Sequence, residues 1–384
     1  MYGISSLKGG GGAERFFADF FSKYQNAKEK KYNLYFLLDK KSIFHLKEVG
    51  KLKEKQNIWL FRLFSNRFKN QLEAFQLCCY IIIHRIKIVH IPLYNLSYIP
   101  LLKTINNLPR LFRPKLTINI VNCYVADSLK DEKSPYHNSF KATYIPLFHD
   151  IKVNGYFCWN KSFVDYVSSN TFFTFKPQII QSIVSRFSDV NSFQPEKKHR
   201  WVVFASRLDE QKHPEMFLKA LANLNRKNHA LTTHWKFFIC GDGPLRNELI
   251  VFSKENDLEH CVEFRIEGQM EKILNHSQVY VSCQSFDNFP SLTMSEAMAS
   301  GNAIIARNVG QTSLFVKNTI NGLILEQDNE FGLEKALIQI LSDDVLVSRM
   351  GKASEGLIKD VHNFENFVTQ IEDFWSNVLS MSSE

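Results

Sequence analysis

Apolar and polar positions along the chain fall into two kinds of block. Short runs that are almost entirely apolar recur between longer segments in which apolar residues return every three or four positions. The first kind predicts strands buried on both faces, and the second predicts amphipathic helices. Strands of this kind that alternate with helices predict parallel sheets covered on both faces. The pattern therefore predicts an α/β protein with doubly wound, Rossmann-like sheets.

The alternation occurs twice along the chain. In the first half, the apolar runs predict strands at 2–7, 32–38, 86–91, 116–121 and 155–159. In the second half, they predict strands at 201–205, 235–240, 262–266, 279–283 and 303–306. A length of 384 residues also exceeds what one ordinary core accommodates. We therefore expect two doubly wound parallel-sheet domains that face each other across a cleft.

The domain boundaries follow from two segments. The polar segment 188–200 contains Pro195 and ends in a basic cluster, as exposed linkers do. Residues 363–381 carry apolar side chains at helical spacing. We expect an N-terminal domain over 1–190, a C-terminal domain over 191–362, and a helix within 363–384 that packs back on the N-terminal domain.

The net charge of +8 is unevenly distributed. Residues 1–190 hold 28 Lys and Arg against 13 Asp and Glu, whereas the remainder holds 19 against 26. A basic first half predicts an anionic partner such as a lipid surface, an acidic acceptor or a nucleic acid. A merely solvated basic surface is the alternative.

Other compositional features bear on location. The longest apolar run, 77–83, is far shorter than the ~20 residues of a membrane span, and the first residues do not read as a signal peptide. The seven cysteines form no C-x-x-C pair, which favours reduced thiols in a cytosol and provides no zinc site. The first predicted strand is short, which leaves open a start codon upstream.

Four motifs follow predicted strands, where open parallel sheets bind their ligands, and three of them carry candidate site residues. The first is the glycine run 9–12, in which Gly11 and Gly12 would let backbone amides approach a ligand. It fits neither the G-x-G-x-x-G pattern nor a P-loop, and a plain flexible turn is the alternative. The second comprises Arg207 and Lys212, two cations suited to clamping a diphosphate, with solvated loop charges as the alternative. The glycine-rich turn 241–244 is interpreted as mainly structural.

The third motif spans residues 279–301. It predicts a strand, a loop, a helix that starts near Ser291 and a stop at Gly301. The backbone amides of Ser291, Leu292 and Thr293 lie at the positive end of the helix dipole and suit a phosphate. Glu296, one turn further along, suits the vicinal hydroxyls of a ribose, with a helix surface charge as the alternative. Asp287 in the preceding loop suits the hydroxyls of a second sugar.

Taken together, these segments resemble retaining glycosyltransferases of the GT-B fold, of the family 4 or glycosyl transferases group 1 type. This group includes bacterial enzymes that make lipopolysaccharide, capsule and exopolysaccharide. The resemblance rests on "SRLDEQKHPE", "CGDGPL", "FPSLTMSEAMASG" and "NGLIL", in this order within about 193–325, and on the opening "LKGGGGAER". Most of residues 25–190 match nothing specific, as expected if that half selects the acceptor.

The resemblance implies roles for these residues. Arg207 and Lys212 would hold the diphosphate of a nucleotide-sugar donor that is UDP- or GDP-linked, and Glu296 would bind the ribose. The loop around Ile266 to Gly268 would hold the base.

The sequence departs from the family pattern at two positions. Asn288 stands where the first acid of the E-x7-E pair is expected; Asp287 is the nearest acid, and we expect it to act there. Asn122 is the candidate to replace a histidine of the first domain.

We therefore expect a metal-independent and cofactor-independent enzyme that transfers a sugar with retention to a lipid-linked or saccharide acceptor. Its basic half would lie on the cytoplasmic face of the plasma membrane, with no nucleic-acid partner. The alternatives are a sugar-nucleotide epimerase or a phosphorylase on the same fold, an inactive relative, or a non-catalytic polyanion-binding protein. The donor sugar, base, acceptor, linkage and oligomeric state remain open at this point.

Overall fold

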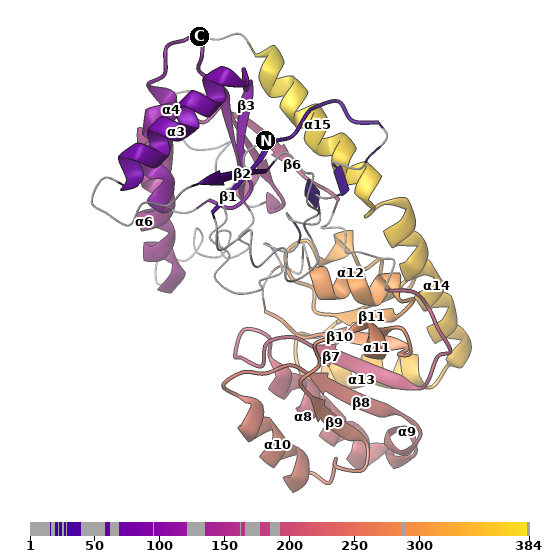
Figure 1. Cartoon of the computed structure of the whole chain (residues 1–384). Helices are drawn as coiled ribbons and strands as arrows, with labels where there is room; N and C mark the ends of the chain where they lie inside the picture. Colours follow the sequence, from indigo (N-terminus) through magenta and orange to yellow (C-terminus); the bar gives the residue numbers. More distant parts are fainter. Residues whose placement is uncertain are drawn as a thin grey trace. The chain divides into compact units, whose positions relative to one another are not determined.

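The computed structural model forms two compact units, residues 1–183 with 364–384 and residues 184–363, which are taken separately below (Figure 1). The structure describes residues 16, 20, 21, 23, 24, 27, 29–39, 58–61, 69–94, 96–120, 135–161, 163–165, 177–184, 193–285, 287, 289 and 291–381. Gly11, Gly12, Asn122 and Asn288 lie outside the described residues, as does the strand expected at 2–7.

The second unit is built on a six-stranded parallel sheet. Its strands are β7 (Trp201–Ala205), β8 (Lys236–Cys240), β9 (Val262–Arg265), β10 (Val279–Ser282), β11 (Ala303–Ala306) and β12 (Gly322–Ile324). They lie in the order β12-β11-β10-β7-β8-β9, so the first strand of the unit is central. The order of the strands reverses between β7 and β10, and this is the topological switch point at which such sheets bind ligands.

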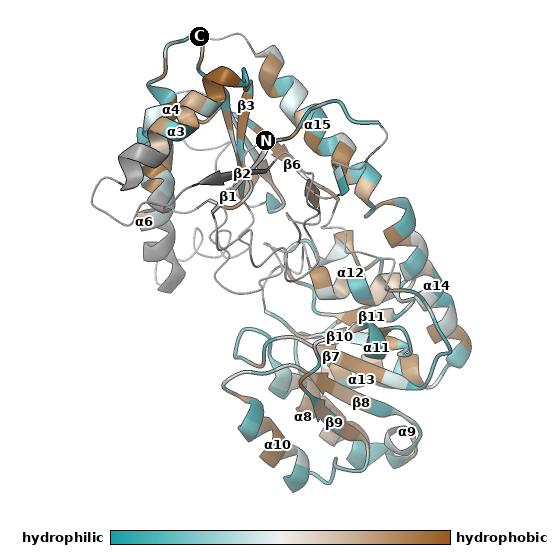
Figure 2. Ribbon diagram, viewed as in Figure 1, coloured by the Kyte–Doolittle hydropathy of each residue, from teal (hydrophilic) through white to brown (hydrophobic). Residues whose placement is uncertain are grey.

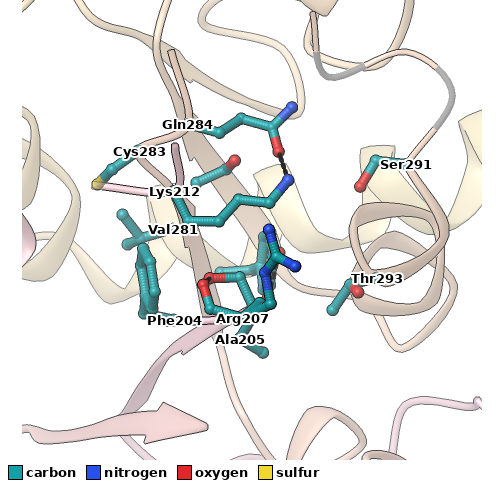
Figure 3. Close-up of a pocket in the computed structure, with 12 residues that line it drawn as sticks. Phe204, Ala205, Arg207, Lys212, Val281, Cys283, Gln284, Ser291 and Thr293 are labelled. Carbon is teal, nitrogen blue, oxygen red and sulfur yellow. Dashed lines mark hydrogen bonds between the residues drawn. The ribbon is translucent and has the colours of Figure 1, made fainter. Parts of the chain in front are cut away.

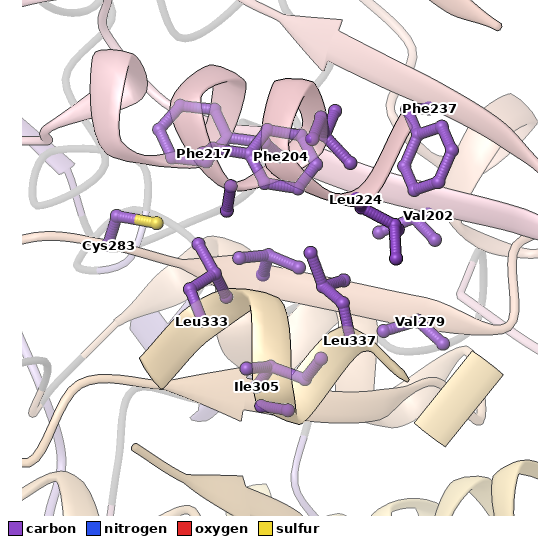
Figure 4. Close-up of a cluster of buried hydrophobic side chains, with 14 of the residues drawn as sticks. Val202, Phe204, Phe217, Leu224, Phe237, Val279, Cys283, Ile305, Leu333 and Leu337 are labelled. Atoms are coloured by element: carbon purple, nitrogen blue, oxygen red, sulfur yellow. The ribbon is translucent and has the colours of Figure 1, made fainter. Parts of the chain in front are cut away.

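Helices cover this sheet. They are α8 (Pro214–Lys227), α9 (His229–His234), α10 (Arg246–Glu255), α11 (Glu271–Leu274), α12 (Leu292–Ala299), α13 (Glu330–Leu341) and α14 (Asp344–Asp360), with the 3-10 turn η2 (Thr312–Leu314). On one face, Phe204 of β7 stacks on Phe217 of α8 with ring centroids 5.6 Å apart, and α13 adds Leu333 and Leu337 to the same core (Figure 4). Val203 precedes Phe204 on β7, so its side chain lies on the opposite face of the sheet, and it is also buried. Both faces of the sheet are therefore covered.

The first unit holds a second parallel sheet. Its strands, in spatial order, are β3 (Ile88–Ile91), β4 (Lys115–Ile120), β5 (Gly155–Cys158) and β6 (Gln178–Gln181). A separate parallel pair consists of β1 (Phe36–Asp39) and β2 (Ile58–Phe61). The helices are α3 (Lys69–Ile83), α4 (Ile99–Asn106) and α6 (Pro135–Asp150), with the 3-10 turn η1 (Leu96–Tyr98).

The helix α15 (Phe364–Ser380) belongs to the first unit although it follows the second along the chain. Its Phe367 ring stacks on Trp159 with centroids 6.0 Å apart, and its Trp375 indole N–H donates to His90 Nδ1 at 3.3 Å. Gly155 of β5 makes room for it, because a Cβ there would lie 2.9 Å from Phe374. The apolar face of α15 is thus part of the core of the first unit.

The structure confirms the predicted α/β class with parallel sheets. The five strands predicted in the second half are present, each within one residue of its predicted bounds. Three strands were not predicted: β2, β6 and β12. The run 32–38 forms β1 only from Phe36 onward. The described cysteines are all free thiols, and no helix among the described residues is long and apolar enough to cross a bilayer.

Candidate functional site

A pocket of about 190 Å³ opens at the switch point, beyond the carboxyl ends of β7 and β10 (Figure 3). It is lined by Phe204, Ala205, Ser206, Arg207, Lys212, Tyr280, Val281, Ser282, Cys283, Gln284, Ser291 and Thr293. Four of the residues predicted from the sequence meet here: two cations from the loop after β7, and Ser291 and Thr293 from the start of α12. The volume is below the ~300–1,000 Å³ of a pocket that holds a whole ligand.

One carboxylate organises the loop that carries both cations. Asp209 is 9% exposed, and its Oδ1 accepts from the backbone amides of Gln211 at 3.1 Å and Lys212 at 3.2 Å. Its Oδ2 pairs with Arg207 Nε. The Arg207 side chain is 66% exposed, so its guanidinium is oriented by Asp209 while remaining accessible to a ligand.

The glycine-rich turn after β8 packs against the loop that carries Arg207 and Lys212. Ser206 N donates to Cys240 O at 3.0 Å, and Leu208 N donates to Asp242 O at 2.9 Å. Gly241 has φ +147°, and a Cβ there would lie 1.9 Å from Ser206 O. A side chain at this position would displace the Arg207 loop, which confirms the structural interpretation of this turn.

The start of α12 forms the opposite wall of the pocket. Ser291 is the N-cap, and its Oγ accepts from Met294 N at 3.3 Å. The amides of Leu292 and Thr293 belong to the first turn, where a helix provides no backbone acceptor for them. The helix ends as predicted, with Gly301 at φ +72°. Figure 3 shows Arg207 and Lys212 reaching toward the side on which Ser291 and Thr293 lie.

Sequence reasoning missed Gln284. Its Oε1 accepts from Lys212 Nζ at 2.7 Å, and its Nε2 donates to Asp287 O at 2.9 Å. This side chain therefore links the pocket cation to the loop before α12. Its position shortly after the buried strand β10 is the signal that could have identified it.

Asp287 lies in that loop but is not among the described residues that line the pocket. Its Oδ1 accepts from Phe289 N at 2.9 Å and from Gln311 N at 2.7 Å. The carboxylate thereby joins the loop after β10 to the loop after β11. This geometry gives Asp287 a positioning role, and its contact with a donor sugar stays a prediction.

Glu296 lies one helical turn beyond the pocket lining. Burial raises the pKa of the Tyr280 hydroxyl, and the negative charge of Glu296 raises it further. Tyr280 lines the pocket and donates to Ala205 O at 3.2 Å, so Glu296 is close to the pocket wall.

Ile266 is 68% exposed and follows β9, two strands away from β7. Neighbouring strands are ~4.8 Å apart, so the loop after β9 begins about 10 Å from the end of β7. Ile266 is therefore separate from the pocket but lies along the same carboxyl edge of the sheet.

Within the described ranges, no three His, Cys, Asp or Glu side chains gather in a way that could hold a metal ion. The positive charge of the pocket comes from Arg207, Lys212 and the helix N-terminus.

Sequence comparison identifies relatives for the second half of the chain. Residues 185–357 match the family model of glycosyl transferases group 1. The chain is 28% identical over 195 residues to a GalNAc-alpha-(1->4)-GalNAc-alpha-(1->3)-diNAcBac-PP-undecaprenol alpha-1,4-N-acetyl-D-galactosaminyltransferase of Campylobacter jejuni, covering 50% of this chain and 52% of that one. It is 27% identical over 176 residues to a UDP-Gal:alpha-D-GlcNAc-diphosphoundecaprenol alpha-1,3-galactosyltransferase of Escherichia coli, covering 45% and 44%. The chain thus spans about half the length of the curated relatives it matches.

Solved structures resemble the whole chain. A glycosyltransferase of Rickettsia africae superposes with a TM-score of 0.71 at 14% identity, covering 99% of this chain and 98% of that one. The HepE protein of Anabaena, in complex with UDP and glucose, superposes with a TM-score of 0.70 at 13% identity, covering 98% of each. At these identities the likeness shows the fold, which is GT-B.

Proposed function

We propose that this protein is a glycosyltransferase, because residues 185–357 match the family model of glycosyl transferases group 1 and the chain has the GT-B fold. It moves a sugar from a nucleotide diphosphate-sugar to a hydroxyl acceptor, with retention at the anomeric carbon and without a metal ion. One observation carries the proposal: Arg207, Lys212 and the N-terminus of α12 surround a single pocket at the switch point of the sheet.

The pocket suits a diphosphate on grounds of charge. Arg207 offers a planar fork for two phosphate oxygens, and Lys212 offers a compact charge. The helix N-terminus adds backbone donors that are fixed in place before the ligand arrives. These groups would stabilise the charge that develops on the diphosphate as it leaves, and the loss of one such donor commonly costs on the order of 10²–10³ in rate.

The nucleoside would extend along the carboxyl edge from this pocket. Glu296 accepts from the two ribose hydroxyls, since a carboxylate oxygen pair matches a vicinal diol. The base lies against the loop after β9, near Ile266, about 10 Å from the end of β7. In this arrangement, the backbone amides of Ser291, Leu292 and Thr293 bind the phosphates. The sugar of the donor lies beyond the phosphates.

In the reaction, the bond from the anomeric carbon to the diphosphate oxygen breaks, and its electron pair stays on that oxygen. The acceptor hydroxyl oxygen bonds to the anomeric carbon on the same face, and its proton passes to the leaving diphosphate. Asp287 and Gln284 act as positioning residues.

The acceptor is proposed to be lipid-linked or a saccharide in the synthesis of a bacterial surface polysaccharide or lipopolysaccharide. The relatives from Campylobacter jejuni and Escherichia coli carry undecaprenol-linked substrates in their names. The basic first half would bring the enzyme to the inner face of the plasma membrane, where such an acceptor would be reached.

A thermal-shift panel of UDP, GDP and their sugars, followed by transfer assays with the donor that binds, tests the proposal. Specific binding raises the melting temperature by mass action. Transfer of labelled sugar to a hydroxyl acceptor supports the proposal, and an inverted or free sugar without acceptor favours an epimerase. The absence of nucleotide binding, together with binding of an oligonucleotide, would replace it with a polyanion-binding role.

A further inference from the structure

Three segments of the first unit meet at the amino edge of its sheet. Residues 84–87 precede β3, residues 107–114 precede β4 and residues 151–154 precede β5. The parallel register pairs Ile88 with Lys115, and Lys115 N donates to Lys87 O at 2.8 Å. The three segments therefore lie side by side, where the chain passes from the carboxyl ends of α3, α4 and α6 to the strands that follow them (Figure 1).

This edge is strongly basic. The cations on these segments and at the start of β4 are Arg85, Lys87, Arg110, Arg113, Lys115 and Lys152. Asp150, which lies two residues before Lys152, pairs with Lys103 at 2.8 Å, and Lys115 Nζ donates to the backbone oxygen of Met381 at 3.1 Å. Burial lowers the pKa of Lys115, and the positive charges of Lys152 and Arg110 lower it further. Lys115, Lys152 and Arg110 are thus close enough for their charges to repel one another, and an anion placed over these three side chains would relieve this repulsion.

The same edge exposes large apolar side chains. Leu111 is 87% exposed and Phe112 is 43% exposed, and both lie between Arg110 and Arg113. Ile83, at the end of α3, is 73% exposed and lies two residues before Arg85. Figure 2 shows the last turn of α3 as strongly hydrophobic. Single exposed apolar residues are ordinary on a protein surface, but here they lie among six cations.

We infer that this basic–apolar edge, residues 83–87, 110–115 and 152, docks on an anionic lipid surface. Leu111, Phe112 and Ile83 enter the boundary between headgroups and acyl chains, while the cations bind lipid phosphates. Two of the three exposed apolar side chains, Leu111 and Ile83, are aliphatic, which fits a lipid surface better than a single-stranded nucleic acid, whose bases stack on aromatic side chains. The inference rests on the membrane part of the proposed function and names the surface responsible.

The test is co-sedimentation of the full chain with vesicles of phosphatidylcholine alone or mixed with phosphatidylglycerol, at low and high salt. We expect binding to the anionic vesicles that weakens as salt rises. A double variant, Lys87→Gln with Arg110→Gln, should bind about thirtyfold more weakly, since each cation contributes roughly one factor of five. Leu111→Ser should weaken binding about tenfold or more.

Matched controls lie on the second unit. Lys236→Gln removes an exposed cation at the amino edge of the other sheet, and Val345→Ser removes an apolar side chain that is 78% exposed. Both should bind like the wild type. The inference is overturned if the wild type ignores anionic vesicles, if it binds neutral vesicles equally, or if Leu111→Ser has no effect. Heparin binding that matches vesicle binding in all variants would also overturn it, in favour of a soluble polyanion. A melting-temperature shift with the nucleotide sugar, measured on the same variants, reports separately on the donor site.

Discussion

The carboxylate of Asp287 lies directly against the backbone of Gly310. A Cβ built on Gly310 would lie 2.3 Å from Asp287 Cγ, and Gly310 has φ +51°, a conformation that favours glycine. The neighbouring amide, Gln311 N, donates to the same carboxylate at 2.7 Å. The loops after β10 and β11 are therefore fitted to one another through a position that tolerates no side chain.

Gly310→Ala should consequently lower turnover more strongly than it lowers the free energy of unfolding. The methyl group pushes Asp287 and the loop before α12 away, and a displacement of about 1 Å near the reacting groups can cost up to about 10²-fold in turnover. Steady-state kinetics and urea unfolding measure the two effects. The matched control is Gly356→Ala in α14, where an added Cβ meets no atom within 4 Å. Equal turnover in both variants would show that the Asp287 loop does not position the donor.

Arg207→Ala should lower kcat/KM on the order of 10²–10³-fold while the protein stays folded, because one donor to the leaving diphosphate is lost. Lys212→Ala should act in the same direction. Lys219→Ala, an exposed cation on α8, serves as the control and should leave the kinetics unchanged. Wild-type turnover in Arg207→Ala would contradict the assignment of the diphosphate to this pocket.

Gln284→Glu should raise the Kd for the donor about tenfold or more. The new carboxylate would pair with Lys212 Nζ, which now lies 2.7 Å from the amide oxygen, and would repel the diphosphate. Gln284→Ala removes the link without adding a charge, so its effect on Kd should be smaller. Calorimetric titration with UDP gives both values, with exposed Gln339→Glu as the charge-matched control. If the Glu and Ala variants bind equally, Lys212 does not contact the phosphates.

Glu296→Gln should reduce discrimination between UDP and 2′,3′-dideoxy-UDP, because the amide oxygen can still accept one hydrogen bond but carries no charge. The wild type should prefer UDP by roughly 10-fold to 100-fold, since hydrogen bonds to a charged group contribute about 1.5–3 kcal/mol. Comparison of the two ligands within each protein is its own control for folding. A wild type that binds the two nucleotides alike would remove Glu296 from the ribose.

His362 should make the second unit sensitive to acid. It packs against Phe289 and Phe315, and its Nε2 bonds to Leu314 O at 3.2 Å. Burial lowers its pKa to about 4 from an ordinary 6.5. The unfolded chain therefore binds the extra proton first, so this contribution to stability is full above pH 6.5 and is lost between pH 6.5 and 4, amounting to roughly 3 kcal/mol.

The measurement is urea unfolding at pH 7 and pH 5 for the wild type and for His362→Phe, which keeps a ring in the cluster but cannot titrate. The variant should lose less stability on acidification. His90 of the first unit also titrates as the pH falls, because burial lowers its pKa to about 3. Its contribution is the same in both proteins, so it cancels when their losses of unfolding free energy are subtracted. Identical pH dependence would mean that His362 is not buried as a neutral ring.

Sequence reasoning was most successful where one physical rule dominated. Continuous apolar runs identified β7, β8, β9, β10 and β11, because strands buried on both faces leave a plain signal. It failed for β12, since the three residues of Gly322–Ile324 are too few to show a period. In the site, the rule that ligands bind beyond the carboxyl ends of parallel strands selected Arg207, Lys212, Ser291 and Thr293 as candidates.

The roles of Asp209, Gln284 and Gly310 could not be read from periodicity. Each depends on the conformation of a loop: Asp209 accepts from amides two and three residues ahead, and Gly310 approaches a side chain 23 positions away in sequence. Such contacts follow from how loops meet after the sheet has assembled. The sequence therefore identified the groups that line the pocket better than the groups that hold them in place.

The place of α15 in the first unit has a consequence for biosynthesis. During translation, residues 1–183 leave the ribosome well before Phe367 and Trp375, which complete their core. The second unit is continuous in sequence over 184–363, so all of its residues are made before α15, and the earlier-made first unit receives its last helix at the end of synthesis. A nascent chain that stalls before residue 364 would expose the apolar surface on which α15 packs. We expect chaperones that recognise apolar surface to bind it until synthesis resumes.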